Sequence, residues 1–290
     1  MNPLAQSVAP QANTSVSSAM LDLTGPAVMG VLNVTPDSFS DGGQFSSVEL
    51  ALLKARQMHS DGAAIIDVGG ESTRPGAAAV SEQEELDRVI PVIEAIHSEL
   101  PILISADTSK PSVMRAAAAA GAAVINDVCA LQADGALATA VELQLPVCLM
   151  HMQGEPRTMQ TDPTYDDVVG DVSEFLTQRV AQCEQAGLSR DLLIVDPGFG
   201  FGKTPQQNME MLANLEQFLQ IACPVLIGVS RKSTLGVVTG RDVGDRLASS
   251  LAAAVAAVLK GALFIRAHDV AETVDAVRIA ACLMKNGDLQ

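Results

Sequence analysis

The stretch ILISADTSKPSVMRAAAAAGAAVIND, residues 102–127, contains a complete strand–helix–strand pattern. An apolar run at 102–106 is followed by Asp107, a helix-forming stretch spans 112–120, and a second apolar run at 123–125 is followed by Asn126 and Asp127. Short apolar runs that alternate with helices are typical of parallel strands with both faces buried. The stretch therefore predicts a parallel β–α–β unit with polar side chains directly after each strand.

The same unit recurs along most of the chain. Apolar runs that predict strands lie at 27–32, 63–68, 102–106, 123–125, 145–150, 192–195, 225–229 and 262–265. Helical spacing is found between them, for example at 48–60, 82–98, 112–120, 166–186 and 246–260. Eight such units predict an α/β protein with a (β/α)8 TIM barrel. A doubly wound open sheet is the alternative, although no predicted strand is followed by G-x-G-x-x-G.

The composition fits one globular domain with a short arm. Of the 290 residues, 48% are hydrophobic and 18% are charged, which is enough apolar material for a substantial core. Residues 1–20 have no hydrophobic periodicity, so we expect a flexible N-terminal arm there and a single barrel domain over 21–290.

Charge and cysteine usage exclude several classes of protein. The net charge of −16 argues against nucleic-acid binding, which needs a surplus of Lys and Arg. The five cysteines are an odd number and include no C-x-x-C pair, which argues against a disulfide framework. No secretory signal precedes Lys54, the first basic residue, and the apolar stretch at 247–259 is too short to span a membrane. We therefore expect a cytoplasmic protein without a membrane partner.

Polar side chains follow many of the predicted strands. They are Asn33, Asp67, Asp107, Asn126, Asp127 and Asp196. In a TIM barrel such side chains converge on the C-terminal mouth, where active sites are built. Asp and Asn also end strands for local reasons, since both suit turns and helix caps. Their recurrence along one chain favours convergence.

Basic residues are expected at the same rim. They are Arg74, Lys203, Arg231, Lys232 and Arg266. Because the chain is acidic overall, their placement there predicts an anionic substrate, although each could be a solvated loop charge.

Eight motifs make the sequence recognisable. They are MGVLNVTPDSFSDGG (29–43), DVGGESTRPG (67–76), SADTSKP (105–111), INDV (125–128), MHMQG (150–154), DPGFGFGK (196–203), SRKS (230–233) and RAHD (266–269). Together they resemble the dihydropteroate synthases, bacterial type, in order and spacing. The resemblance covers nearly everything after the N-terminal arm. It implies a TIM-barrel transferase of folate biosynthesis that joins 6-hydroxymethyl-7,8-dihydropterin diphosphate to p-aminobenzoate and releases pyrophosphate.

The resemblance also implies where the substrates bind. Asp107, Asn126, Asp196 and Lys232 match pterin positions, whose acceptors and donors suit an amino-pyrimidinone edge. Thr73, Arg74, Arg266 and His268 match diphosphate positions, and Asn33 matches a Mg²⁺ position. The p-aminobenzoate site would involve Ser230, Arg231 and Lys232, with Thr73, Pro75 and Phe199 as walls. Among these residues, the resemblance implies that the catalytic ones are Asp107, Lys232, Arg266 and His268.

Two other functions share part of this pattern. A pterin-binding methyltransferase domain would not need Arg74, Arg266 and His268 around a diphosphate. A non-catalytic pterin-binding paralogue would not need Asn33 and Thr73 as well. Like its family, the chain is expected to form a homodimer and to be a sulfonamide target.

Overall fold

The computed structural model describes residues 25–35, 47–72, 79–154, 158–159 and 163–285, with eight parallel strands. These are β1 (Ala27–Asn33), β2 (Ile65–Gly69), β3 (Leu103–Asp107), β4 (Val124–Asp127), β5 (Val147–Met150), β6 (Leu193–Asp196), β7 (Leu226–Ile227) and β8 (Phe264–Ala267). Their order is β6-β5-β4-β3-β2-β1-β8-β7, and a parallel bridge between Val195 and Val225 joins the two ends. The strands therefore form a nearly closed barrel, which confirms the predicted (β/α)8 class.

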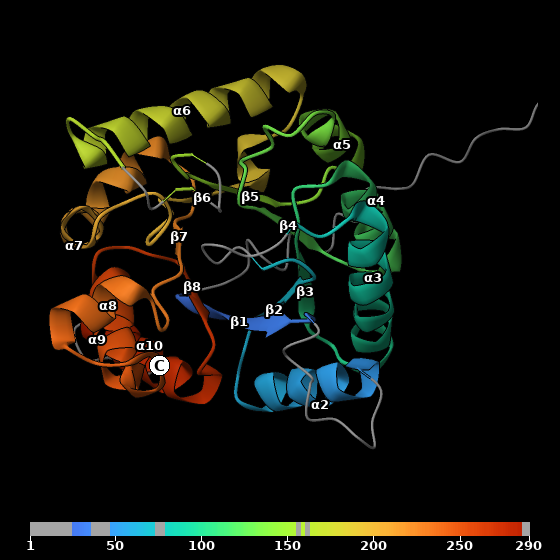
Figure 1. Cartoon of the computed structure of the whole chain (residues 1–290), viewed down its shortest axis with the longest axis horizontal. Coiled ribbons are helices and arrows are strands. Elements are labelled where there is room, and N and C mark those ends of the chain that lie inside the picture. Colours follow the sequence, from blue (N-terminus) through green and yellow to red (C-terminus); the bar gives the residue numbers. More distant parts are fainter. Residues whose placement is uncertain (1–24, 36–46, 73–78, 155–157, 160–162, 286–290) are drawn as a thin grey trace, which may run out of the picture.

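Helices surround the strands as an outer ring (Figure 1). They are α2 (Ser47–Ser60), α3 (Glu82–Glu99), α4 (Pro111–Ala120), α5 (Ala136–Leu143), α6 (Val168–Ala186), α7 (Pro205–Ala213), α8 (Ser233–Thr239), α9 (Leu247–Leu259) and α10 (Val270–Met284). Short 3-10 segments accompany them in the described ranges: η2 (Arg190–Leu192), η3 (Leu215–Ile221) and η4 (Val243–Asp245). All five helices predicted above are confirmed within two residues at each end.

Local sequence signals set the ends of several helices. Ser81 and Glu84 form a capping box at the start of α3, in which each side chain accepts from the other residue's backbone N–H. Pro111 begins α4, and Gly121 ends it with a φ of 112°, a left-handed conformation that favours glycine. The connections after β2 and β3 therefore enter the next helix at fixed points.

Each predicted apolar run overlaps an observed strand, but many of the strands end one or two residues later than predicted. Asp107, Asp127 and Asp196 lie inside β3, β4 and β6, because strand pairing continues through the polar residue. The polar side chains are thus held by the sheet itself and not by the loops that follow it. The expected N-terminal arm, residues 1–20, lies outside the described residues.

The barrel interior is divided into an apolar layer and a polar layer. One position from each strand contributes to the apolar layer. Seven of these side chains are buried (Met29, Ile65, Val124, Cys148, Ile194, Leu226 and Phe264), and the partly buried Leu103 packs against them. Strand neighbours such as Val28 and Ile66 belong instead to the larger core between strands and helices. Because side chains alternate along a strand, residues two positions further on face the interior again, one level higher. That level includes Asp67, Asn126, Asp196 and Arg266.

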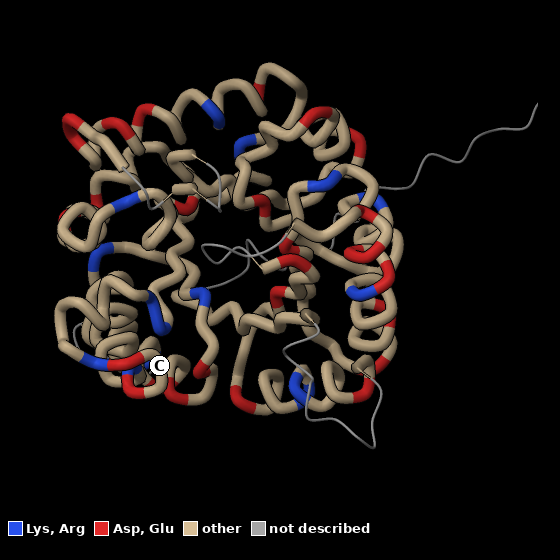
Figure 2. Tube along the Cα trace, viewed as in Figure 1, with Lys and Arg blue, Asp and Glu red and all other residues tan. Residues whose placement is uncertain are grey.

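Charged residues are otherwise distributed over the outside. In Figure 2 the acidic positions are spread around the outer helices, with basic positions scattered among them. No helix in the described ranges combines the length and apolarity that a membrane crossing needs.

Candidate active site

The polar layer opens at the C-terminal ends of the strands, where a deep hollow is lined from several strands. Its lining includes Asp107, Asn126, Asp196, Lys232, Arg266 and His268. An outer hollow adjoins it and adds Asn33, Glu71, Ser72 and Arg231. The predicted convergence of strand-end residues is thus confirmed for four of the six, Asn33, Asp107, Asn126 and Asp196, which line these hollows.

On one side of the mouth, Arg266 binds two carboxylates. Its Nε donates to Oδ2 of Asp67 at 2.7 Å, and its Nη2 donates to Oδ2 of Asp107 at 2.8 Å. The Asn126 amide also donates to Oδ2 of Asp67, at 3.1 Å. We call these four residues the guanidinium side: Asp67, Asp107, Asn126 and Arg266.

Burial controls the titration of this side. Asp67 is fully buried, and its second oxygen accepts no hydrogen bond from any described residue. Burial and the nearby Asp67 carboxylate raise the pKa of Asp107 to about 7, although Arg266 opposes the shift. Two carboxylates that share one guanidinium cannot both be ionised without a cost, so protonation of Asp107 lies within reach of neutral pH.

The opposite side of the mouth is organised by backbone groups and lysines. Oδ1 of Asp196 accepts from the Gly198 N–H at 2.7 Å. Burial raises the pKa of Asp196 to about 6, while Lys232, Lys203 and Arg266 act in the opposite direction. The Lys232 ammonium lies 4.0 Å from the centre of the Phe201 ring, a cation–π contact that places it at the edge of the hollow. We call His151, Asp196, Lys203 and Lys232 the lysine side.

Lys203 does not lie at the rim as predicted. Its side chain is 1% exposed, and its ammonium donates to His151 Nδ1, Phe201 O and Gly198 O at 2.9, 2.9 and 3.1 Å. Burial is possible because the turn after β6 folds over the end of β5, and the turn and His151 together supply the acceptors. The expectation of a rim cation at Lys203 is therefore wrong.

Asp127 also departs from the prediction. It follows Asn126 on β4, so its side chain faces away from the barrel interior. There it is buried, contacts the Ser109 hydroxyl and accepts from the backbone N–H groups of Cys129 and Leu131 at 2.8 and 2.7 Å. Asp127 therefore fixes the loops after β3 and β4 and does not line the hollow.

Ser230 and His268 lie side by side at the ends of β7 and β8. The Ser230 hydroxyl lies 3.1 Å from His268 Nδ1 and accepts from the His268 backbone N–H at 3.2 Å. Arg231 has a positive φ of 57°, its backbone N–H donates to Ser250 Oγ, and its guanidinium binds the Asp269 carboxylate. The Arg231 side chain is thus already paired at the outer edge of the site.

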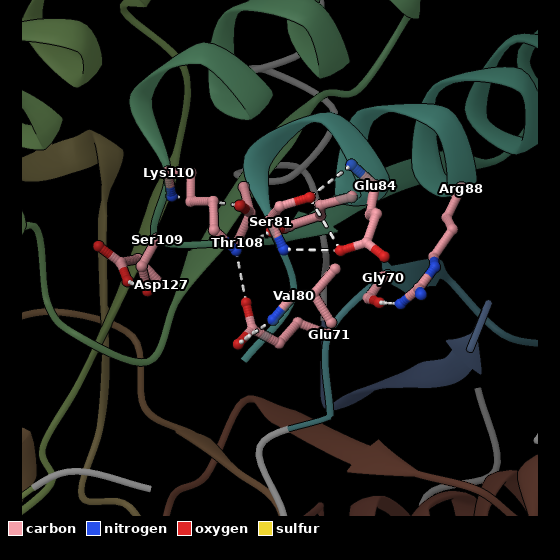
Figure 3. A network of polar contacts seen from close by, with 11 residues as sticks. Gly70, Glu71, Val80, Ser81, Glu84, Arg88, Thr108, Ser109, Lys110 and Asp127 are labelled. Carbon is pink, nitrogen blue, oxygen red and sulfur yellow. Dashed lines mark hydrogen bonds and ion pairs between the residues drawn. The ribbon is translucent and has the colours of Figure 1, made fainter. Parts of the chain in front are cut away.

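A further network fixes the loop that leaves β2 (Figure 3). The Lys110 ammonium bridges Glu71, two residues after β2, and Glu85, which is buried on α3. Arg88 adds a bond from its Nη1 to the carbonyl of Gly70 at 3.0 Å. The start of the loop after β2 is therefore fixed at Gly70 and Glu71. Thr73, Arg74 and Pro75, predicted above as substrate contacts, lie outside the described residues.

Asn33 ends β1 and lines the outer hollow with Asp107 and His268. In the described part of the chain, no three His, Cys, Asp or Glu side chains meet in a way that could hold a metal ion. The Asn33 amide is a single neutral oxygen ligand beside cationic residues, which is too little to bind an ion that only protein groups enclose. It does suit Mg²⁺, which keeps several waters and shares the phosphate oxygens of a substrate.

Phe199 is placed deeper than its predicted role suggests. It is 1% exposed and lines the deep hollow with Asn126 and Asp196, whereas Phe201 lines both hollows.

Asp67 is the main residue that the structure adds to the predicted set of site residues. Its signal in the sequence is its position directly after an apolar run, which it shares with Asp107 and Asp196.

Comparison with known proteins is consistent with this geometry. Residues 29–268 match the family model described as pterin binding enzyme. Dihydropteroate synthase of Escherichia coli K12 is 54% identical over 259 residues, which are 89% of this chain and 92% of that protein. A Yersinia pestis dihydropteroate synthase solved with a sulfonamide drug complex has a TM-score of 0.87 and 50% identity, and the match covers 91% of this chain and 96% of that one.

A third similar protein carries the reaction product. A Xanthomonas albilineans dihydropteroate synthase in complex with 7,8-dihydropteroate has a TM-score of 0.83 and 46% identity, over 90% of this chain and 95% of that one. The matches thus extend across both hollows, from Asn33 at the end of β1 to His268 after β8.

Proposed function

The chain belongs to the pterin-binding enzymes, among the dihydropteroate synthases, and we propose from this premise how its barrel mouth joins a dihydropterin to p-aminobenzoate. The chain is a transferase that forms 7,8-dihydropteroate and pyrophosphate. The observation that carries the assignment of roles is the meeting of Asp107, Asn126, Asp196 and Lys232 in one hollow. These residues come from four different strand ends, and only the closed barrel brings them together.

The deep hollow is proposed to bind the pterin ring. An amino-pyrimidinone edge offers several N–H donors and a carbonyl, so it needs carboxylate acceptors and an amide that both donates and accepts. Asp196 and Asp107 supply the acceptors, Asn126 supplies the amide, and Lys232 donates to the ring. A hydrogen bond to a charged group contributes about 1.5–3 kcal/mol, so two such pairs dominate recognition of the ring.

The diphosphate is proposed to lie beside β8 and the loop after β2. Arg266 and His268 face this part of the outer hollow, and the sequence places Thr73 and Arg74 on the neighbouring loop. Asn33 would hold Mg²⁺ through its amide oxygen, and the ion supplies positive charge for the departing diphosphate. Arg266 can contribute here because it also lines the outer hollow while bound to Asp67.

The p-aminobenzoate site is proposed at the end of β7. The Ser230 hydroxyl and the backbone around Arg231 would receive the carboxylate, while Lys232 reaches both substrates. Phe199, which lines the deep hollow, would close the inner end of this site, and Thr73 and Pro75 from the loop after β2 would form its other walls. Sulfonamides resemble p-aminobenzoate, so the same place is proposed as their target.

The reaction is proposed to be a substitution of SN1 character. The bond from the pterin methylene carbon to the diphosphate oxygen breaks first, and the electron pair leaves with pyrophosphate. The amine nitrogen of p-aminobenzoate then forms the new C–N bond and gives one proton to solvent. This amine is neutral at working pH, so the site needs no strong general base. The contributions of Asp107, Lys232, Arg266 and His268 are preorganised charge and orientation.

Residues 21–290 are proposed to form the catalytic domain of a cytoplasmic homodimer, with 1–20 as its arm. Support for the dimer comes from exposed apolar side chains on three helices at one side of the barrel. They are Val237 and Val238 on α8, Leu247 and Leu259 on α9, and Ile279, Leu283 and Met284 on α10. Such side chains are commonly covered in an interface between subunits.

Turnover by the purified chain tests the proposal. The assay contains 6-hydroxymethyl-7,8-dihydropterin diphosphate and Mg²⁺, with or without the second substrate p-aminobenzoate, and the readouts are pyrophosphate and dihydropteroate. Release of pyrophosphate that depends on p-aminobenzoate is expected. Pterin binding without turnover would instead indicate a binding paralogue or a methyltransferase domain.

A further inference from the structure

Lys203 is a buried cation for which the reaction above has no use. Its three N–H donors go to His151 Nδ1, Phe201 O and Gly198 O, and none of these acceptors is a carboxylate. Burying a charge without an opposite charge beside it costs several kcal/mol. A lysine that only filled space could be replaced by an apolar side chain, so its charge indicates a function.

His151 cannot share this charge. It is 7% exposed, and burial together with Lys203 lowers its pKa to about 3, so the ring stays neutral and Nδ1 accepts from the ammonium. The ring also packs edge-on against Phe175 with centroids 4.9 Å apart. Any positive charge on this pair therefore resides on Lys203, and the Tyr165 ring, whose centroid lies 5.9 Å from the Lys203 Nζ, is a further neutral neighbour.

Gly198 connects Lys203 to Asp196. The Gly198 carbonyl accepts from Lys203, and the Gly198 N–H donates to Asp196 Oδ1. This residue has a φ of 71°, and a Cβ there would lie 1.9 Å from the His151 carbonyl, so only glycine fits. The ammonium thus fixes the peptide that fixes the carboxylate.

We propose that Lys203 is a positioning residue of the pterin hollow, which holds the turn at 198–203 and keeps Asp196 oriented and ionised for the pterin edge. The inference rests on the proposed function, since it assigns to Lys203 the positioning of Asp196, one of the proposed pterin acceptors. Other charged groups facing Asp196 are Lys232 at the end of β7 and Arg266 on β8, and the buried Cys148 thiol on β5 is neutral.

The sign of the effect follows from the titration. The pKa of Asp196 is raised to about 6 by burial, and the Lys203 charge opposes this rise. Burial lowers the pKa of Lys203 to about 7, so it is still protonated at the pH where Asp196 titrates. Pterin donors favour the ionised carboxylates, so the contribution of Asp196 to affinity falls below this pH, in addition to the fall that Asp107 sets near pH 7. Removing the Lys203 charge should raise the pKa of Asp196 and move this fall to higher pH.

The test measures pterin diphosphate affinity of the full chain from pH 5 to pH 8. Lys203→Met removes the charge at similar volume, and Lys203→Gln keeps a donor for the carbonyls of the turn. Lys54→Met is the control for loss of a lysine charge, because Lys54 is exposed on α2, outside the barrel and away from Asp196. Melting temperature and circular dichroism establish that each variant folds.

We call the fall in pterin diphosphate affinity at low pH the acid limb. We expect both Lys203 variants to move this acid limb to higher pH. Affinity at pH 6 should weaken by up to about tenfold if loss of the Lys203 charge makes Asp196 a tenfold weaker acid. Lys54→Met should leave the limb where it is. An unmoved limb in a folded Lys203→Met or Lys203→Gln protein, with normal binding by the unsubstituted chain, would overturn this inference alone. Absence of pterin binding by the unsubstituted chain would overturn the proposed function as well.

Discussion

On the guanidinium side of the mouth, Arg266 binds the Asp67 and Asp107 carboxylates directly, whereas on the lysine side Lys203 donates only to neutral acceptors. The first arrangement neutralises charge by contact between side chains. The second keeps an ionised carboxylate and a cation apart, with a backbone peptide between them. The guanidinium side should therefore contribute to both folding and function, while the lysine side should contribute mainly to ligand recognition.

The largest effect is expected from Arg266→Ala. Loss of the guanidinium leaves two buried carboxylates without an opposite charge, and breaking such a buried ion pair costs about 3–5 kcal/mol of stability. It also removes a preorganised cation from the proposed diphosphate site, which should lower kcat/KM by about 10²–10³-fold. Denaturant unfolding and steady-state turnover measure the two effects.

Arg56→Ala is the control for this change. Arg56 is exposed and pairs with Glu99 on the outside, so its loss should change stability by at most about 1 kcal/mol. Retention of both stability and turnover in Arg266→Ala would remove the distinction between the two sides.

A smaller effect is expected from Asp67→Asn. The amide still accepts from Arg266 but has no charge, so kcat/KM at neutral pH should fall about tenfold, equivalent to a hydrogen bond to a charged group. The Asp67 charge raises the pKa of Asp107, and its removal should lower that pKa. Asp107 then stays ionised to lower pH, so the acid limb of kcat/KM should move downward.

The downward movement of the acid limb in Asp67→Asn is opposite to the upward movement expected for Lys203→Met. The two directions together distinguish the guanidinium side from the lysine side. Asp87→Asn, an exposed position on α3, should leave the pH profile unchanged. An upward movement of the limb in Asp67→Asn would mean that Asp67 does not act on Asp107 as the geometry indicates.

The sequence predicts the strands and the residues that face the mouth because both depend on short-range patterns. Apolar runs and their polar ends locate β3, β4 and β6, and alternation then places Asn126 and Asp196 in the hollow. The same pattern fails for Asp127, since a difference of one residue turns a side chain to the other face.

Long-range contacts explain what the sequence could not provide. Asp67 meets Arg266 across 199 positions of the chain, and Lys203 finds His151 across 52. Pairing and burial of these charges depend on the closed barrel, and no local pattern encodes them. Membership of the family supplied roles for the matching positions but none for Asp67 or the buried Lys203.

The smallest effect on activity is expected below the polar layer. Ile65 lies two residues before Asp67 and is fully buried in the apolar layer. Ile65→Val should cost about 0.5–1.5 kcal/mol of stability and leave kcat/KM within about twofold. Thermal unfolding together with turnover checks this. A large loss of turnover at unchanged stability would show that the apolar layer takes part in the reaction.

The most direct test of the difference between the two sides is calorimetric binding of pterin diphosphate to Asp196→Asn. The amide oxygen still accepts from Gly198, but it replaces a buried charge that only the ligand is proposed to pair. We predict affinity weaker by about 10–100-fold at pH 8, from the loss of a charge-assisted bond, with a melting temperature equal to or above that of the unsubstituted chain. Unchanged affinity, or lost affinity only together with lost stability, would contradict the assignment of the lysine side to pterin recognition.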